Sequence, residues 1–72
     1  MRAEQIISKA LKAVDGDSYI LSLMVAKRAN NIKAGSKILI DGITLDKYKT
    51  ADIALMEIAD GLVSLELLED NQ

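Results

Sequence analysis

The chain has 72 residues, a length that allows one small domain, residues 1–72. It contains neither cysteine nor histidine, which excludes disulfides and the common zinc sites. Half of the residues are hydrophobic, but no window approaches the roughly 18 apolar residues of a membrane span. The N-terminus lacks a secretory signal, so we expect a cytoplasmic protein. The net charge of −2 argues against a dedicated nucleic-acid binder, because such proteins usually present strongly basic surfaces.

The first predicted element is an amphipathic helix over residues 4–14, "EQIISKALKAV". Its apolar residues recur at helical spacing and fall on one face, whereas its serine and lysines fall on the other. Gly16 is placed to adopt the left-handed conformation that follows a helix end. Asp17 is placed to cap a second helix by accepting hydrogen bonds from the first-turn N–H groups.

The second predicted helix covers residues 18–34 and is apolar on every side over residues 19–26. A helix of this kind requires burial all round, which one small domain supplies with difficulty. The C-terminal half is basic and rich in amides, and Gly35 is a natural end of the helix. This surface fits three interpretations, namely solvated surface, nucleic-acid contact and protein docking.

Residues 36–48 follow as a connecting segment, "SKILIDGITLDKY". Two short apolar runs flank Asp41-Gly42, which is a common hairpin signal. An isolated two-stranded hairpin is marginally stable in water, so an extended loop packed on a helix is the competing prediction.

The third predicted helix covers residues 50–60, and Gly61 ends it. One apolar stripe contains Ala51, Ala54, Leu55 and Ile58. Ile53 and Met56 fall on the far side of that stripe, which gives the helix apolar surface that its own fold does not obviously use. The acidic side chains of this helix are most simply its solvated face. These are Asp52, Glu57 and Asp60.

The sequence contains no arrangement of residues that predicts catalysis. The commonest acid–base and nucleophilic residues, His and Cys, are absent, and no phosphate-binding glycine motif is present. A helix-turn-helix reader is disfavoured because recognition helices contact bases with their N-terminal residues, and here that end is "SYIL". Two possibilities remain, namely a self-sufficient bundle and a domain whose apolar surface is covered by a partner.

Two blocks of the sequence resemble a known family. "DSYILSLMVAKRANNIKAGSK" resembles the "RF-LV-vAarRARql--G" pattern of the bacterial RNA polymerase omega subunit, and "KTADIALMEIADGLV" resembles that family's "K-vtiALrEIaeGki" block. Both occur in the right order and spacing, and together they cover about half of the chain. The short length and the segment "MVAKRA" resemble omega subunits of the Campylobacter–Helicobacter kind of bacterium.

The resemblance implies an all-α, three-helix omega-subunit-like core with an extended loop over residues 36–48. It implies a non-catalytic subunit that clamps the largest polymerase subunit, β′, and promotes its assembly with the two α subunits and β. Sigma factor belongs to the same complex, and the magnesium-dependent chemistry belongs to other subunits. No cofactor is expected for this chain. Binding of the alarmone ppGpp is not carried over, because "MRAEQ" departs from the family's "MARVT"-like N-terminus.

The resemblance also implies which residues contact β′. Tyr19 stands where the family has an aromatic residue at the start of its main helix. Lys27 and Arg28 stand at the family's basic pair, with lysine replacing one arginine, and Asn30 stands where a further arginine is common. The full set of expected contact residues is Tyr19, Leu21, Leu23, Val25, Ala26, Lys27, Arg28, Lys49, Ile53, Met56 and Glu57. The alternative from another class is a stand-alone helical homodimer that binds DNA through residues 27–37.

Overall fold

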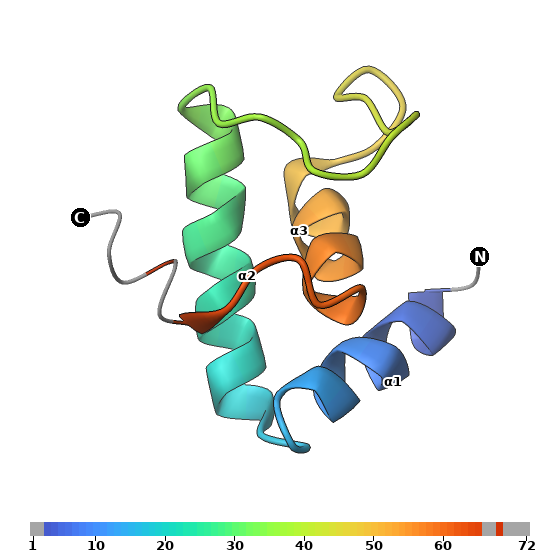
Figure 1. The fold of residues 1–72 in the computed structure, drawn as a ribbon, viewed down its shortest axis with the longest axis vertical. Coiled ribbons are helices and arrows are strands. Elements are labelled where there is room, and N and C mark those ends of the chain that lie inside the picture. The colour runs from blue at the N-terminus through green and yellow to red at the C-terminus, as the bar shows by residue number, and fades with distance from the viewer. Residues whose placement is uncertain (1–2, 66–67, 69–72) are drawn as a thin grey trace.

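The computed structural model describes residues 3–65 and residue 68, and three α-helices lie within them. Helix α1 spans Ala3–Ala13, α2 spans Ser18–Lys33 and α3 spans Thr50–Ala59. α3 packs against both α1 and α2, which contact each other much less. Residues 34–49 form a long connection that leaves the end of α2 and returns to the start of α3 (Figure 1).

The helical fold class is confirmed, and so are the three helices within about one residue at each end. The described residues contain no strand, so the loop alternative for residues 36–48 is the right one and the hairpin is excluded. None of the helices in the described part of the chain is long and apolar enough to cross a membrane.

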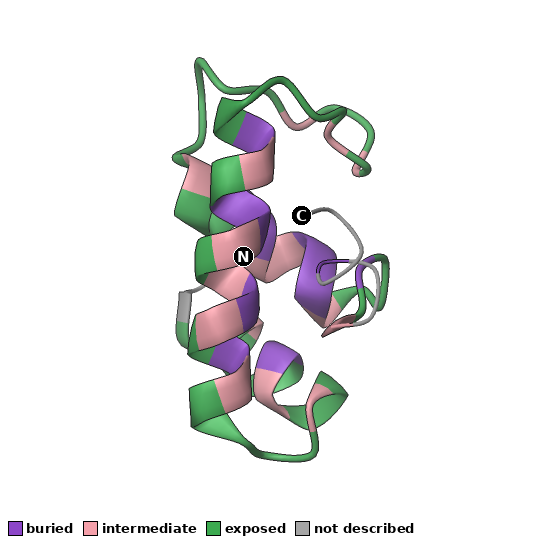
Figure 2. Ribbon diagram, turned by 90° about the vertical axis from the view of Figure 1, so that its left-hand side faces the viewer, coloured by how far each residue is buried: buried purple, intermediate pink, exposed green. Residues whose placement is uncertain are grey.

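The core lies where the three helices meet. The buried residues of α2 gather on one side of that helix and the exposed ones on the other (Figure 2). The core cluster combines residues of α1, α2 and α3 with residues that follow α3. Its buried members are Ala10, Leu21, Met24, Ile58, Val63 and Leu68. These side chains are aliphatic or methionine, as the scarcity of aromatic residues requires.

Ile53 corrects the expected orientation of α3. The apolar stripe of the sequence placed Ile53 on the far side of the helix, but its side chain is fully buried. Glu57 lies four residues later on the same side and is also fully buried, because residues i and i+4 share one face of a helix. The buried face of α3 therefore includes Glu57 as well as Ile53. A prediction that assigns only apolar residues to the buried face cannot find this orientation.

Local hydrogen bonds define the turn between α1 and α2. Asp15 at φ 55° and Gly16 at φ 80° both adopt left-handed conformations, so the expected left-handed turn is longer by one residue. The Gly16 N–H donates to Leu11 O at 2.7 Å and the Asp15 N–H donates to Lys12 O at 3.3 Å, which is the Schellman pattern. The carboxylate of Asp17 accepts from the Ile20 N–H at 3.1 Å, which confirms Asp17 as the N-cap of α2.

Asp17→Ala is expected to lower the free energy of unfolding by about 1 kcal/mol, because the substitution removes the acceptor for an N–H group at the start of α2. Urea unfolding followed by circular dichroism measures the change. Ser18→Ala is the matched control, because Ser18 is exposed and alanine favours the helix. Equal stabilities of the two variants would contradict a capping role for Asp17.

Candidate protein-interaction surface

The carboxylate side chains of the described residues do not form a metal centre. No group of three or more carboxylate side chains lies close enough to hold a metal ion in the part of the chain that the structure describes. The most buried carboxylate, Glu57, is engaged by an arginine.

An ion pair between α2 and α3 is buried inside the domain. Arg28 Nε donates to Glu57 Oε1 at 2.5 Å, and Arg28 Nη2 donates to Glu57 Oε2 at 3.1 Å. Arg28 is 5% exposed and Glu57 is fully buried. The expectation that Glu57 belongs to a solvated face is wrong, because the guanidinium neutralises its charge and binds both oxygens.

The same ion pair holds the connection between α2 and α3. Arg28 Nη2 also donates to Lys37 O at 2.8 Å, and the Leu39 N–H donates to Glu57 Oε2 at 2.8 Å. Four hydrogen bonds therefore join α2, the connection and α3 at one point. Arg28 and Glu57 act inside the domain, where Nε and Nη2 of the arginine and both carboxylate oxygens of the glutamate are engaged.

The side of α2 that points away from α3 forms an exposed stripe, which we call the outer face. It consists of Tyr19, Ser22, Ala26, Asn30 and Lys33, all of which are exposed. They recur at intervals of three or four residues, as required for one face of a helix. Tyr19 is 74% exposed, so the large aromatic side chain at the start of the helix is left outside the core.

An apolar groove borders the outer face. It lies between α1 and α2, has a volume of about 390 Å³, and we call it the α1–α2 groove. Its lining consists of Ile7, Leu21, Ser22, Val25, Ala26 and Leu55. Ser22 and Ala26 belong to both the groove and the outer face, so the two form one continuous surface. Their small side chains permit a close approach by another chain.

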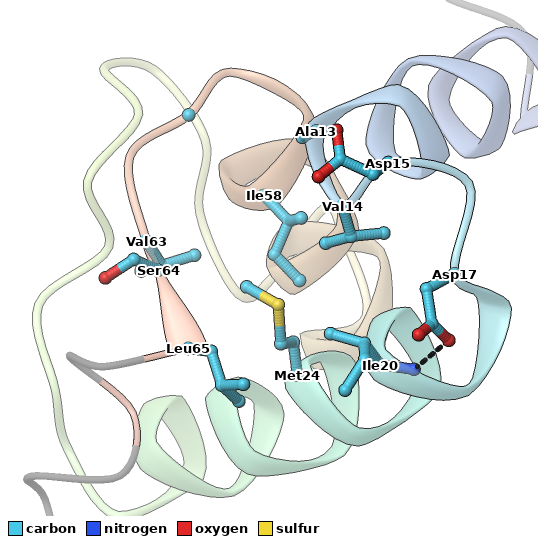
Figure 3. A pocket seen from close by; sticks show the side chains of 11 residues that line it. Ala13, Val14, Asp15, Asp17, Ile20, Met24, Ile58, Val63, Ser64 and Leu65 are labelled. Carbon is cyan, nitrogen blue, oxygen red and sulfur yellow. Dashed lines mark hydrogen bonds between the residues drawn. The ribbon is translucent and has the colours of Figure 1, made fainter.

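A second, wider hollow opens near the start of α2 (Figure 3). It has a volume of about 600 Å³ and is lined by the α1–α2 turn, α2, the end of α3 and the residues that follow α3. Val14, Ile20, Met24 and Ile58 point into it, and Asp15 and Asp17 lie at one side. Apolar surface is thus accessible on two sides of α2.

The structure separates the expected contact residues into two groups. The exposed and half-buried ones can reach a partner, and the buried ones pack inside the domain, although Leu21 also lines the α1–α2 groove. The first group is Tyr19, Leu23, Val25, Ala26, Lys27, Lys49 and Met56, and the second is Leu21, Arg28, Ile53 and Glu57. Sequence reasoning missed three exposed apolar residues of the connection. These are Leu39, Leu45 and Tyr48.

Residues 38–40 show why Leu39 was missed. Ile38 and Ile40 are half-buried while Leu39 between them is exposed, which is the alternation of an extended chain with one face packed. All three residues are apolar, so their sequence carries no signal of which one faces outward.

Comparisons with known proteins address the identity of the chain. The family model described as RNA polymerase Rpb6 matches residues 10–65. The DNA-directed RNA polymerase subunit omega of Campylobacter curvus is 51% identical over the full length of both chains. The omega subunit of Nitratiruptor sp. is 46% identical over 99% of this chain and all of its own length, and that of Helicobacter hepaticus is 40% identical over 100% and 96%. No solved structure gives a significant match. The chain therefore belongs to the RNA polymerase Rpb6 family and, within it, to the omega subunits of bacterial DNA-directed RNA polymerase.

Proposed function

We propose that the chain is a non-catalytic polymerase subunit that holds the largest subunit, β′, and promotes its assembly with two α subunits and β in the cytoplasm. The nucleotidyl-transfer site lies in the other subunits. This chain contributes binding surface and no reacting group. The contact with β′ is the specific part of the proposal, and the family membership of the chain is its starting point.

One observation carries the proposal, namely the outer face of α2 together with the α1–α2 groove. Tyr19 is the most exposed large apolar residue in the described part of the chain, and tyrosine is among the residues that most often dominate protein interfaces. The groove beside it is apolar and open. A β′ segment that covers this surface would bury it, at roughly 25 cal/mol per Å² of apolar area before the cost of association.

Binding also suits the size of the domain. A chain of 72 residues buries only about 60% of the surface that its unfolded form exposes, so its free energy of unfolding is small. A partner that binds only the folded state stabilises it by mass action. The subunit and β′ would thus stabilise each other, which is what promotion of assembly requires.

The homodimeric DNA-binding alternative is disfavoured by the position of Arg28. Within residues 27–37, this arginine is the side chain best suited to bind phosphates and guanine. Its guanidinium, however, is bound to Glu57 and to the Lys37 carbonyl inside the domain. Opening that pair would leave a buried carboxylate uncompensated, which is costly.

Affinity purification from the source bacterium tests the proposal. The tagged chain is expected to co-purify with β′, β and α in stoichiometric amounts at moderate salt. The isolated chain is expected to show no salt-sensitive affinity for duplex DNA in fluorescence anisotropy. A stable homodimer that binds duplex DNA and leaves the polymerase behind would overturn the proposal.

A further inference from the structure

We propose that residues 33–49, here called the basic loop, form a second docking surface, which binds an acidic segment with apolar side chains in a polymerase subunit. The inference rests on the proposed function, because it takes the partner to be part of the polymerase. It adds a contact site that adjoins the outer face of α2 at Lys33, which belongs to both, together with the chemistry of the segment that binds there.

The basic loop carries an excess of positive charge in an acidic protein. It contains four lysines and two aspartates, whereas the whole chain has a net charge of −2. All four lysines are exposed, and among the described residues none of them forms an ion pair. They are Lys33, Lys37, Lys47 and Lys49. Asp60, which directly follows α3, is paired instead with Lys9 of α1 at 3.0 Å. The positive charge is therefore left for a partner.

Exposed apolar side chains accompany these lysines. The described residues include six exposed large hydrophobic side chains, and three of them, Leu39, Leu45 and Tyr48, lie in the basic loop. Their exposed fractions are 42%, 54% and 40%. A nucleic-acid surface needs positive charge and does not need exposed leucines, whereas a protein interface combines apolar anchors with a charged rim. The composition of the loop therefore favours a protein segment.

The loop is held in place before any partner binds. The Arg28–Glu57 pair binds the carbonyl of Lys37 and the N–H of Leu39. Two tight turns follow, in which the Ile43 N–H donates to Ile40 O at 3.4 Å and the Lys47 N–H donates to Thr44 O at 3.2 Å. Ile40 and Ile43 also line a small hollow with Met56 of α3, so one side of the loop packs on the domain. A fixed loop loses less conformational entropy when it binds.

The charge and polarity of the loop define its partner. Asp or Glu side chains of the partner pair with the exposed lysines, and its aliphatic or aromatic side chains cover the two leucines and the tyrosine. Pairs of exposed charges mainly accelerate association and are weakened by salt. Binding at this site is therefore expected to be salt-sensitive, in contrast to binding at the apolar α1–α2 groove.

A charge-neutralising variant tests the surface. Lys37→Gln/Lys47→Gln/Lys49→Gln changes the net charge by −3, and the control Ser8→Glu/Lys12→Glu makes the same change on exposed positions of α1. Binding to polymerase core prepared without this subunit is measured across a salt series. At low salt the loop variant is expected to bind about tenfold more weakly than the control and to lose the salt dependence. Circular dichroism verifies that both variants are folded.

The outcomes separate this inference from the proposed function. If the natural chain does not bind polymerase, the proposed function fails. If it binds and the loop variant matches the control at every salt concentration, the basic loop is not a docking surface. If the loop variant instead loses a salt-sensitive affinity for duplex DNA while its polymerase binding is unchanged, the loop is a nucleic-acid surface and the inference is overturned.

Zero-length cross-linking with a carbodiimide locates the partner segment independently. The reagent joins a lysine amine to a carboxyl group in direct contact, so it reports the expected charge pairs. In the assembled polymerase, Lys37, Lys47 or Lys49 is expected to become linked to Asp or Glu of another subunit, identified by mass spectrometry. Links from these lysines only to carboxylates of the same chain would overturn the inference.

Discussion

Glu57→Ala is expected to destabilise the domain by about 3–5 kcal/mol, because it removes one partner of a buried ion pair and leaves Arg28 without its counter-charge. The Leu39 N–H loses its acceptor at the same time. Domains of this length typically have a stability of about 4–10 kcal/mol. The substitution therefore removes much of the total, and it also releases the start of the basic loop from α3.

Urea unfolding followed by circular dichroism at 222 nm measures the effect. Asp60→Ala, at the residue that directly follows the same helix, is the matched control, because its ion pair with Lys9 is exposed and contributes about 0–1 kcal/mol. The double variant Arg28→Met/Glu57→Leu is expected to recover part of the lost stability. Apolar residues of similar volume commonly replace a buried pair without net cost, but the Lys37 carbonyl and the Leu39 N–H still lose their partners. A loss for Glu57→Ala no greater than that of Asp60→Ala would contradict the internal role of the pair.

The helices and their ends were predictable because their determinants are local. The spacing of Ile6, Ile7, Ala10 and Leu11 is within one helix, and the cap at Asp17 depends on a residue three positions away. Gly35, which follows α2, has a positive φ of 108°, and its prediction depends only on the residue type at that position. None of these features needs information from a distant part of the chain.

The interior position of Glu57 was not predictable in the same way. Its burial depends on Arg28, which lies 29 residues earlier, and on the connection that supplies the Leu39 N–H. A hydrophobic pattern assigns a glutamate to the surface, and with it Ile53 on the same side. The pattern therefore placed Ile53 and Glu57 on the outside of α3, whereas both side chains are fully buried. The pattern also left the sides of α2 undecided, because Tyr19 and Leu21 are both apolar although only Leu21 is buried.

Ala26→Arg is expected to weaken binding to polymerase by about 100-fold or more while leaving the isolated domain folded. Ala26 is exposed at the middle of the outer face and also lines the α1–α2 groove. Arginine has a high helix propensity, so the substitution costs the free domain little. A long charged side chain there prevents close approach by a partner and would have to be desolvated without a counter-charge.

Surface plasmon resonance with immobilised polymerase core lacking this subunit measures the loss of affinity, and thermal unfolding verifies the fold. Ala51→Arg is the matched control, because it makes the same substitution at an exposed position of α3 outside the groove and the outer face. Tyr19→Ala is expected to weaken binding to polymerase at least tenfold, because it removes the aromatic anchor. The domain is expected to stay folded, because the Tyr19 side chain is 74% exposed. If Ala26→Arg bound as tightly as Ala51→Arg, the partner would not cover the outer face. The basic loop and the wider hollow near the start of α2 would then remain as the surfaces available to a polymerase subunit.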